Sequence, residues 1–335
     1  MKRADTKLMK EINKNLIRSE FLEQLEATAS ELSQKVKLSI VTVNALLKEM
    51  IEDKEVFEGG SIPSKGGRPS MVYRYNSLFK CAAIIYGFSK NNQDYINLIV
   101  INLLGECIHR EVGAFERIID NSFDEMLDRA FAKYPTIEVI SFGLPGAEEN
   151  GIITINDYPD IIGDTFMKHY EERYSVPVVF VNDINAAANG YYNYHLNNQP
   201  EDTVSGIFFP RVYPPGAGTI INGEIYTGTS NFPGEFGNMP IGVDWLELDY
   251  KNTEEVSDAI GKVVAITSCI LAPKHFVLYG DFWQKDSGKK IKERAEKLLN
   301  NKFEVNIVLS NDFERDYELG MIKVALGQLR KYLLI

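Results

Sequence analysis

The stretch Val179-Phe180-Val181-Asn182-Asp183-Ile184-Asn185-Ala186-Ala187-Ala188 joins an apolar run to polar residues and then to a helix-forming run. The apolar residues at 176–181 favour a buried strand, and the residues at 183–194 favour a helix. Further strand-like runs stand at 81–88, 95–103 and 139–142. This alternation of strands and helices predicts an α/β body with layers around a central sheet.

The polar pair at this junction, Asn182 and Asp183, is a candidate binding site. A carboxylate at the end of a strand can accept hydrogen bonds from the hydroxyl groups of a polyol and can act as a general base. Asp183 could instead cap the helix that begins beside it. The two roles are compatible, so the sequence leaves both open.

Length and composition describe an ordinary globular protein. A chain of 335 residues has room for two or three domains, and 44% hydrophobic with 25% charged residues exclude the disordered and fibrous classes. No apolar run approaches the roughly 18 residues that span a bilayer, and no signal peptide stands at the start, so we expect a cytoplasmic protein without a membrane partner. The cysteines, Cys81, Cys107 and Cys269, are far apart, and we expect buried thiols rather than a disulfide or a zinc site.

The net charge of −11 is unevenly distributed along the chain. Residues 1–80 hold 14 Lys and Arg against 11 Asp and Glu, which leaves 22 against 36 for the remainder. A small positive excess over the first 80 residues is compatible with binding to phosphates. The asymmetry is mild and does not by itself identify a DNA-binding domain.

Three amphipathic helices are predicted before residue 53. Leu8, Ile12 and Leu16 recur at intervals of four in a first helix over 7–25. A Thr-x-x-Glu capping box at 28–31 opens a second helix through residue 36, and Ser39 can cap a third. Two short helices joined by a tight turn form a helix-turn-helix pattern. A plain three-helix packing unit has the same pattern, so the helices alone leave DNA binding open.

A β-hairpin with a glycine-rich tip is predicted after the helices. Strands at 54–58 and 70–75 flank a loop that contains Lys65-Gly66-Gly67-Arg68-Pro69. Glycines let the backbone approach a groove closely, while Lys65 and Arg68 offer positive charge to phosphates or to a narrow minor groove. A solvated surface loop is the alternative.

The run Leu38-Ser39-Ile40-Val41-Thr42-Val43-Asn44, with Gly67-Arg68-Pro69 and Asn76 after it, resembles the winged helix-turn-helix of repressors in the ROK family (repressor, open reading frame, kinase). Such repressors often carry a basic residue where Ile40 stands. Here Ile40 and Val41 would touch thymine methyl groups, and the polar residues after them would contact bases and phosphates. The predicted DNA-binding residues are Ser39, Ile40, Val41, Thr42, Asn44, Lys48, Lys65 and Arg68.

Three motifs of the body resemble the same family in their order and spacing. They are Gly143-Leu144-Pro145-Gly146, the junction at 179–188, and the glycine-rich stretch at 216–223 followed by Gly234-Glu235-Phe236-Gly237. The resemblance implies a two-lobed body of the actin-like (RNase H-like) ATPase fold with a sugar cleft between its lobes. The implied domains are a winged helix-turn-helix domain at 1–78, a first lobe at 79–184 with a C-terminal helix at 315–335 packed back on it, and a second lobe at 185–314.

Two phosphate-handling segments of the family pattern are missing. Kinases of the family open the body with an Asp-x-Gly-Gly-Thr turn, but the matching stretch, Lys90-Asn91-Asn92-Gln93-Asp94, has no glycine pair and a lysine in place of the acid. Val212-Tyr213-Pro214-Pro215 replaces the glycines of a second phosphate loop, and proline has no N–H to donate. Asn238 stands where the family has a zinc-binding His, and 240–252 contains no cysteine, so we expect no metal.

The sequence therefore predicts a DNA-binding repressor that senses a sugar or sugar derivative without phosphoryl transfer, enzymatic activity or a cofactor. Its partners would be double-stranded operator DNA, a small carbohydrate effector and further copies in a homodimer or higher homo-oligomer. Asp183 would be the degenerate position of the kinase base. The predicted ligand-binding residues are Asn156, Asn182, Asp183, Glu235 and Asn238. Two alternatives stay open: a sugar kinase with an attached DNA-binding head, and a constitutive DNA-binding protein whose body only dimerises.

Overall fold

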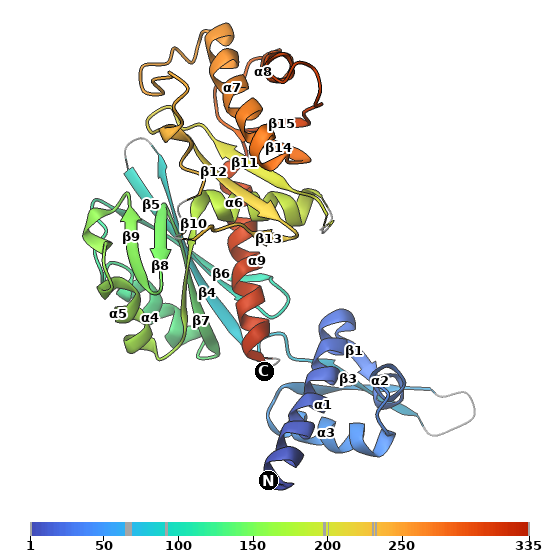
Figure 1. The fold of residues 1–335 in the computed structure, drawn as a ribbon. Helices are drawn as coiled ribbons and strands as arrows, with labels where there is room; N and C mark the ends of the chain where they lie inside the picture. Colours follow the sequence, from blue (N-terminus) through green and yellow to red (C-terminus); the bar gives the residue numbers. More distant parts are fainter. Residues whose placement is uncertain are drawn as a thin grey trace.

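The protein consists of a small head and a larger body of two lobes (Figure 1). The structure is a computed structural model that describes residues 2–63, 69–90, 93–196, 199, 201–229, 231 and 233–333. We call residues 2–75 the head, 81–182 the first lobe and 204–310 the second lobe. A long C-terminal helix runs from the second lobe past the first lobe to the head (Figure 1).

The described part of the head contains three helices and a three-stranded antiparallel sheet. Its elements are α1 (Lys2–Gln24), β1 (Glu26–Thr28), α2 (Ala29–Val36), α3 (Ile40–Glu52), β2 (Val56–Ile62) and β3 (Ser70–Tyr75). The strand order is β1-β3-β2, so the hairpin of β2 and β3 is extended by the short strand that precedes α2.

Side-chain caps fix the ends of the two short helices. The Thr28 hydroxyl accepts a hydrogen bond from the Glu31 N–H at 3.2 Å, and the Glu31 carboxylate accepts one from the Thr28 N–H at 2.7 Å, which confirms the predicted capping box. Lys37 ends α2 with a left-handed φ of 54°. Ser39 then caps α3 by accepting from the Thr42 N–H at 3.1 Å. These local hydrogen bonds set the tight turn between α2 and α3.

The hairpin strands lie close to their predicted positions. β3 has the predicted bounds, but β2 begins two residues later than predicted and continues to Ile62. The reason is that Lys54 has a left-handed φ of 61° and turns the chain before the strand can begin. The tip of the hairpin, with Lys65 and Arg68, lies outside the described residues.

The first lobe is a five-stranded sheet with helices on one face and the C-terminal helix on the other (Figure 1). Its elements are β4 (Cys81–Lys90), β5 (Gln93–Asn102), β6 (Cys107–Phe115), α4 (Asp124–Lys133), β7 (Ile137–Leu144), β8 (Gly146–Glu149), β9 (Ile152–Asn156), η1 (Pro159–Ile161), α5 (Thr165–Tyr174) and β10 (Val178–Asn182). The order is β10-β7-β4-β5-β6, in which β10, β7 and β4 are parallel. Because both faces are covered, alternate residues of β4 enter two different core clusters.

The second lobe repeats this topology. It contains β11 (Val204–Phe208), β12 (Gly216–Ile221), β13 (Glu224–Ile225), η2 (Phe236–Asn238), α7 (Thr253–Leu271), β14 (His275–Tyr279), α8 (Ser287–Leu298) and β15 (Ile307–Ser310). The order is β13-β12-β11-β14-β15, with β11, β14 and β15 parallel. Each lobe thus places three parallel strands beside two antiparallel ones, and the predicted α/β body is confirmed.

Two helices cross between the lobes, α6 (Asp183–His195) and α9 (Phe313–Leu333). Glycines bring their backbones together, because a Cβ at Gly190 would lie 1.9 Å from the Asp316 carbonyl oxygen and one at Gly320 would lie 1.7 Å from the Ala186 carbonyl oxygen. α9 also packs on β4 and β7 of the first lobe. α9 begins two residues before the predicted helix at 315–335.

One hydrophobic cluster continues from the head into the body. Ile17 and Phe21 of α1 belong to it together with Leu329 and Leu333 at the end of α9. The head is therefore packed against the body through α9 and is not simply tethered by the residues that follow β3.

The prediction that the cysteines are buried is correct for Cys81 and wrong for Cys107 and Cys269, which are exposed. Cys107 opens the edge strand β6, and Cys269 lies in the last turn of α7, so neither thiol is covered by a neighbouring element. Among the described residues, no helix is long and apolar enough to cross a membrane.

Candidate functional site

The junction of β10 and α6 has a hydrogen-bonded helix cap. Asn182 Oδ1 accepts from the N–H groups of Ile184 at 3.0 Å and Asn185 at 3.1 Å, and its Nδ2 donates to the Gly146 carbonyl at 3.1 Å. Asp183 Oδ1 accepts from the Ile184 N–H at 2.9 Å. Asn182 is thus the main cap of α6, a role that the sequence also allowed for Asp183. The second carboxylate oxygen of Asp183 makes none of these cap hydrogen bonds.

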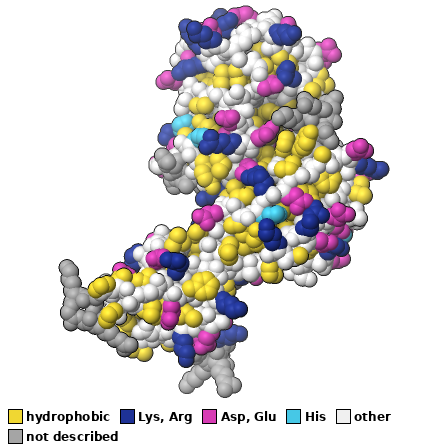
Figure 2. All heavy atoms as spheres, turned by 180° about the vertical axis from the view of Figure 1, so that it is seen from behind, with side chains coloured by type: hydrophobic (Ala, Val, Ile, Leu, Met, Phe, Trp, Pro, Cys, Tyr) yellow, Lys and Arg dark blue, Asp and Glu magenta, His cyan; other side chains and the backbone are white. Residues whose placement is uncertain are grey.

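Asp183 borders a cavity of about 620 Å³ where the two lobes and α9 meet. The first lobe contributes Gly87, Pro145, Asp157 and Tyr158, the second lobe Phe209, Arg211, Tyr213 and Asp281, and the start of α9 Phe313 and Glu314. Hydrophobic side chains are exposed at the waist between the lobes on the face seen in Figure 2, where both signs of charge are interspersed. The cavity is a cleft of ligand size that combines a few polar groups with an apolar wall.

The acidic groups in and near this cleft influence one another. Burial raises the pKa of Asp183 to about 7; the Ile184 N–H opposes the shift, and the negative charges of Asp157 and Glu235 add to it. Burial also raises the pKa of Glu235, again with a contribution from Asp157. A carboxyl group that titrates near neutrality can both donate and accept hydrogen bonds, which suits the hydroxyls of a polyol.

The other predicted ligand residues occupy three different settings. Glu235 stands directly before η2 and Asn238 ends it. Both residues are exposed as a whole, although the neighbourhood of the Glu235 carboxyl is crowded enough to raise its pKa. Asn156 is buried at the end of β9, where its Oδ1 accepts from the Tyr158 N–H at 2.8 Å and its Nδ2 has no hydrogen-bond partner among the described residues. Asn182 borders a separate cavity of about 130 Å³. Asp183 is the one predicted ligand residue that borders the described wall of the large cleft.

Of the two segments predicted to have lost phosphate binding, the second borders the cleft through Val212 and Tyr213. The ladder between β4 and β5 continues to the pair of Lys90 and Gln93, and residues 91 and 92 lie outside the described part. On the opposite side, Val212 and Tyr213 are 69% and 53% exposed. Arg211 beside them donates to the carboxylate of Asp281. In the described residues, no group of three or more His, Cys, Asp and Glu is arranged to hold a metal ion.

The predicted DNA-binding side chains lie at the start of α3. Ile40 and Val41 are 45% and 75% exposed, although both are aliphatic. Asn44 and Lys48, one and two turns further, are exposed as well. Ser39 and Thr42 serve the helix cap, and their hydroxyl oxygens are 2.8 Å apart. One face of α3 therefore presents two apolar, one amide and one cationic side chain to solvent, while the opposite face is buried.

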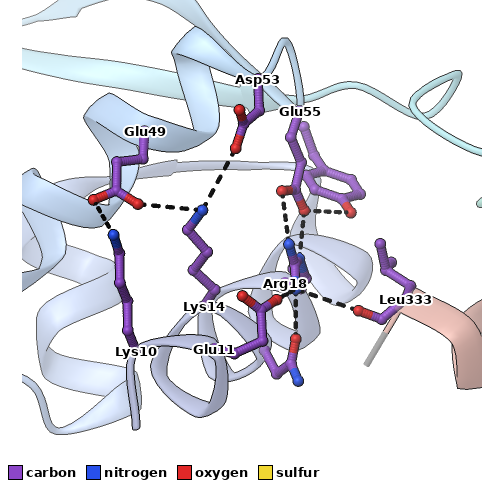
Figure 3. Close-up of polar contacts among 10 residues, drawn as sticks. Lys10, Glu11, Lys14, Arg18, Glu49, Asp53, Glu55 and Leu333 are labelled. Atoms are coloured by element: carbon purple, nitrogen blue, oxygen red, sulfur yellow. Dashed lines mark hydrogen bonds and ion pairs between the residues drawn. The ribbon is translucent and has the colours of Figure 1, made fainter. Parts of the chain in front are cut away.

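A buried ionic cluster at the junction of head and body was not predicted (Figure 3). Arg18 of α1 donates from Nε and Nη2 to the two carboxylate oxygens of Glu55 at 2.7 and 3.1 Å. Its Nη1 donates to Glu11 and, at 3.3 Å, to the carbonyl of Leu333 at the end of α9. Burial alone would lower the pKa of Arg18, but the hydrogen bonds and charges of Glu55 and Glu11 outweigh it and raise the pKa.

The sequence carried one signal for this cluster. Lys14 and Arg18 are four residues apart in α1, as are the buried Ile17 and Phe21. A charged stripe therefore runs beside the apolar stripe of this helix. Lys14 likewise reaches Glu49 at 3.3 Å and Asp53 at 3.5 Å (Figure 3). Helix periodicity could thus identify the charged stripe but not its partners.

Comparison with known proteins agrees with this geometry. Residues 92–252 match the ROK family. The chain contains a ROK family domain. The xylose repressor of Caldicellulosiruptor bescii is 28% identical over 246 residues, which are 70% of this chain and 60% of that protein. The chain spans about 60% of the length of the curated relatives it matches first.

Solved structures of ROK proteins share the fold. The crystal structure of a ROK family transcriptional regulator, a homologue of the E. coli MLC protein, aligns with a TM-score of 0.66 and 14% identity, covering 97% of this chain and 99% of that one. The ROK hexokinase from Thermus thermophilus aligns with a TM-score of 0.60 and 16% identity, covering 75% of this chain and 99% of that one. The sugar-kinase-like body is therefore common to regulators and kinases, and the fold does not separate the two.

Proposed function

We propose that this protein is a sugar-responsive, DNA-binding repressor whose head reads operator DNA and whose cleft binds a sugar without phosphoryl transfer. The observation that carries the proposal is the exposed face of α3, which places aliphatic, amide and cationic side chains on a capped helix beside a β-hairpin. The relative named xylose repressor and the regulator structure that covers the head as well as the body support it.

In this proposal the head is a winged helix-turn-helix domain within residues 1–78. α3 enters the major groove, where Ile40 and Val41 contact thymine methyl groups and Asn44 reads a base edge. Lys48 contacts a phosphate. The hairpin of β2 and β3 forms the wing, and its tip brings Lys65 and Arg68 to the backbone or the minor groove.

The cleft binds the sugar between a first lobe at 79–184, on which α9 packs, and a second lobe at 185–314. Asp183, which borders this cleft, accepts hydrogen bonds from hydroxyl groups. Glu235 and Asn156 stay predicted ligand residues outside its described lining, and the buried Nδ2 of Asn156 has no partner among the described residues. Phosphoryl transfer is not proposed, because Pro214 and Pro215 lack the N–H groups that a phosphate loop needs.

The sugar acts on the head through α9. This helix of 21 residues is about 30 Å long at 1.5 Å per residue. Glu314 at its start borders the cleft, and its last described carbonyl, that of Leu333, is held by Arg18 of the head. Closure of the cleft that moves α9 therefore moves the head. The sugar shifts this equilibrium only by its different affinity for the two states.

DNA binding would require two heads. In a two-fold homodimer, or a higher homo-oligomer, the α3 helices contact half-sites separated by one helical turn, about 34–36 Å, or a multiple of it. The operator is then an inverted repeat.

A gel-shift experiment on the DNA upstream of the chain's own gene tests the function. Lys48→Ala and Arg68→Ala should each weaken binding and reduce the slope of log K against log salt by about one unit, since each removes one phosphate contact. Lys289→Ala, an exposed lysine of α8, is the control that should leave the slope unchanged. The proposal fails if no sequence-specific shift occurs, or if Mg-ATP and a hexose or pentose give turnover that disappears in Asp183→Asn.

A further inference from the structure

Aromatic side chains line much of the cleft that Asp183 borders. Phe208 at the end of β11 and Phe313 at the start of α9 stack with ring centroids 4.3 Å apart and an angle of 12° between their planes. Phe88 from β4 and Tyr213 from the loop after β11 also line the cleft. Tyr213 is 53% exposed, so much of its side chain is accessible to a ligand. These residues lie beside the segment in which Val212-Tyr213-Pro214-Pro215 stands in place of glycines.

The charges of the cleft disfavour an anionic ligand. Among its described lining residues there are four carboxylates, Asp157, Asp183, Asp281 and Glu314, and one guanidinium, Arg211. Arg211 is paired with Asp281, so its charge is already compensated. A phosphate group would meet acidic side chains and prolines that have no N–H to donate. Most of the other lining residues are aromatic or acidic, which suits an uncharged ligand with an apolar surface.

The cleft is also large for a single sugar ring. Its volume of about 620 Å³ lies within the range of roughly 300–1,000 Å³ that holds drug-sized ligands, which are considerably larger than a pentose or hexose. A pyranose ring has hydroxyl groups at its edge and C–H groups on its faces, so one ring can hydrogen-bond with carboxylates while another lies flat on aromatic side chains. The lining of this cleft offers both kinds of contact, because it contains four carboxylates and several aromatic side chains.

We infer that the ligand is an uncharged glycoside of two units, with a first sugar ring at Asp183 and a second ring or aryl group against Tyr213 and Phe313. The inference rests on the proposed function, because it specifies the ligand of the same cleft. In this inference the aromatic residues favour a disaccharide or aryl glycoside over the monosaccharide. The acidic lining disfavours a sugar phosphate.

Isothermal titration calorimetry on the full chain tests the inference with two matched series. One consists of xylose, xylobiose and 4-nitrophenyl β-xyloside, and the other of glucose, cellobiose, 4-nitrophenyl β-glucoside and glucose 6-phosphate. In the series that binds, we expect the two-unit ligand to bind at least tenfold more tightly than the monosaccharide. In the glucose series, we expect the phosphate to bind at least tenfold more weakly than glucose.

Variants of the aromatic residues test the contact with the second unit. Tyr213→Ala should abolish the tenfold preference and leave monosaccharide affinity unchanged, and because Tyr213 is exposed this variant should fold. Phe313→Ala should act in the same direction, and its thermal unfolding is measured beside that of wild type because Phe313 stacks on Phe208. Tyr194→Ala, an exposed tyrosine outside the cleft lining, should change no affinity.

The outcomes distinguish this inference from the function on which it rests. Equal affinities for monosaccharide and two-unit ligand, or tighter binding of glucose 6-phosphate than of glucose, would overturn the inference and leave a sugar-responsive repressor in place. A chain that shifts operator DNA but binds no member of either series would overturn sugar sensing itself.

Discussion

Replacing Arg18 by methionine should loosen the head while leaving the first lobe intact. Arg18 and Glu55 are 8% and 0% exposed and are joined by two hydrogen bonds of 2.7 and 3.1 Å. Removal of one partner of a buried ion pair leaves an uncompensated charge and costs about 3–5 kcal/mol. Glu55 keeps the hydrogen bond from the Tyr75 hydroxyl at 3.1 Å, so we expect the lower end, about 3 kcal/mol.

Hydrogen exchange measured by mass spectrometry reports the head and the lobes separately. A loss of about 3 kcal/mol should accelerate exchange in α1, α3 and β2 roughly 10²-fold, because about 1.4 kcal/mol corresponds to a factor of ten. Exchange in α4 and α5 should not change, since their apolar residues belong to a different core cluster from those of α1.

Two further variants make the result specific to the buried charge. The double variant Arg18→Met with Glu55→Gln removes both charges and should recover most of the loss. Arg74→Met breaks an ion pair with Glu26 in the same head, but these side chains are 61% and 47% exposed, so the cost should stay below about 1 kcal/mol. Equal effects of Arg18→Met and Arg74→Met, or a double variant as labile as the single one, would refute the reasoning.

Three other predictions concern stability. Gly320→Ala should lower the free energy of unfolding by about 3 kcal/mol or more in chemical denaturation, because its Cβ would meet the Ala186 carbonyl. Gly327→Ala in the same helix has no atom within 4 Å of its Cβ and should raise that free energy by about 1 kcal/mol. The reverse order would contradict the helix crossing. Asp183→Asn should raise the melting temperature more at pH 8 than at pH 4. In the folded protein the carboxyl keeps its proton to about pH 7, whereas in the unfolded chain its pKa is 3.8, so wild-type stability falls as the pH rises through this window. A pH-independent difference in melting temperature would contradict the raised pKa. Thr28→Ala should cost about 1 kcal/mol and accelerate exchange mainly in α2, and an unchanged α2 would show that the capping box is dispensable.

The elements that the sequence determined are those whose signals lie within a few residues of one another. The capping box of Thr28 and Glu31 and the Ser39 cap join residues three apart, and the strand bounds of β3 follow from its alternating pattern and the flanking turn residues. The same is true of the α/β alternation and of the exposed position of Ile40 and Val41. Their energies are local, so a short window of sequence contains both partners.

The tertiary structure decided which side chains meet across the chain. Arg18 and the Leu333 carbonyl are 315 residues apart in sequence, and the spacing of neither predicts the other. Asn182, the cap of α6, also donates from its amide to the carbonyl of Gly146 at the start of β8, a contact that the local sequence does not predict. Exposure of Cys107 and Cys269 depends equally on which elements cover them. Such contacts depend on the packing of whole helices and lobes, because a charge or a thiol is buried only when distant segments come together. A short stretch of sequence therefore does not predict them.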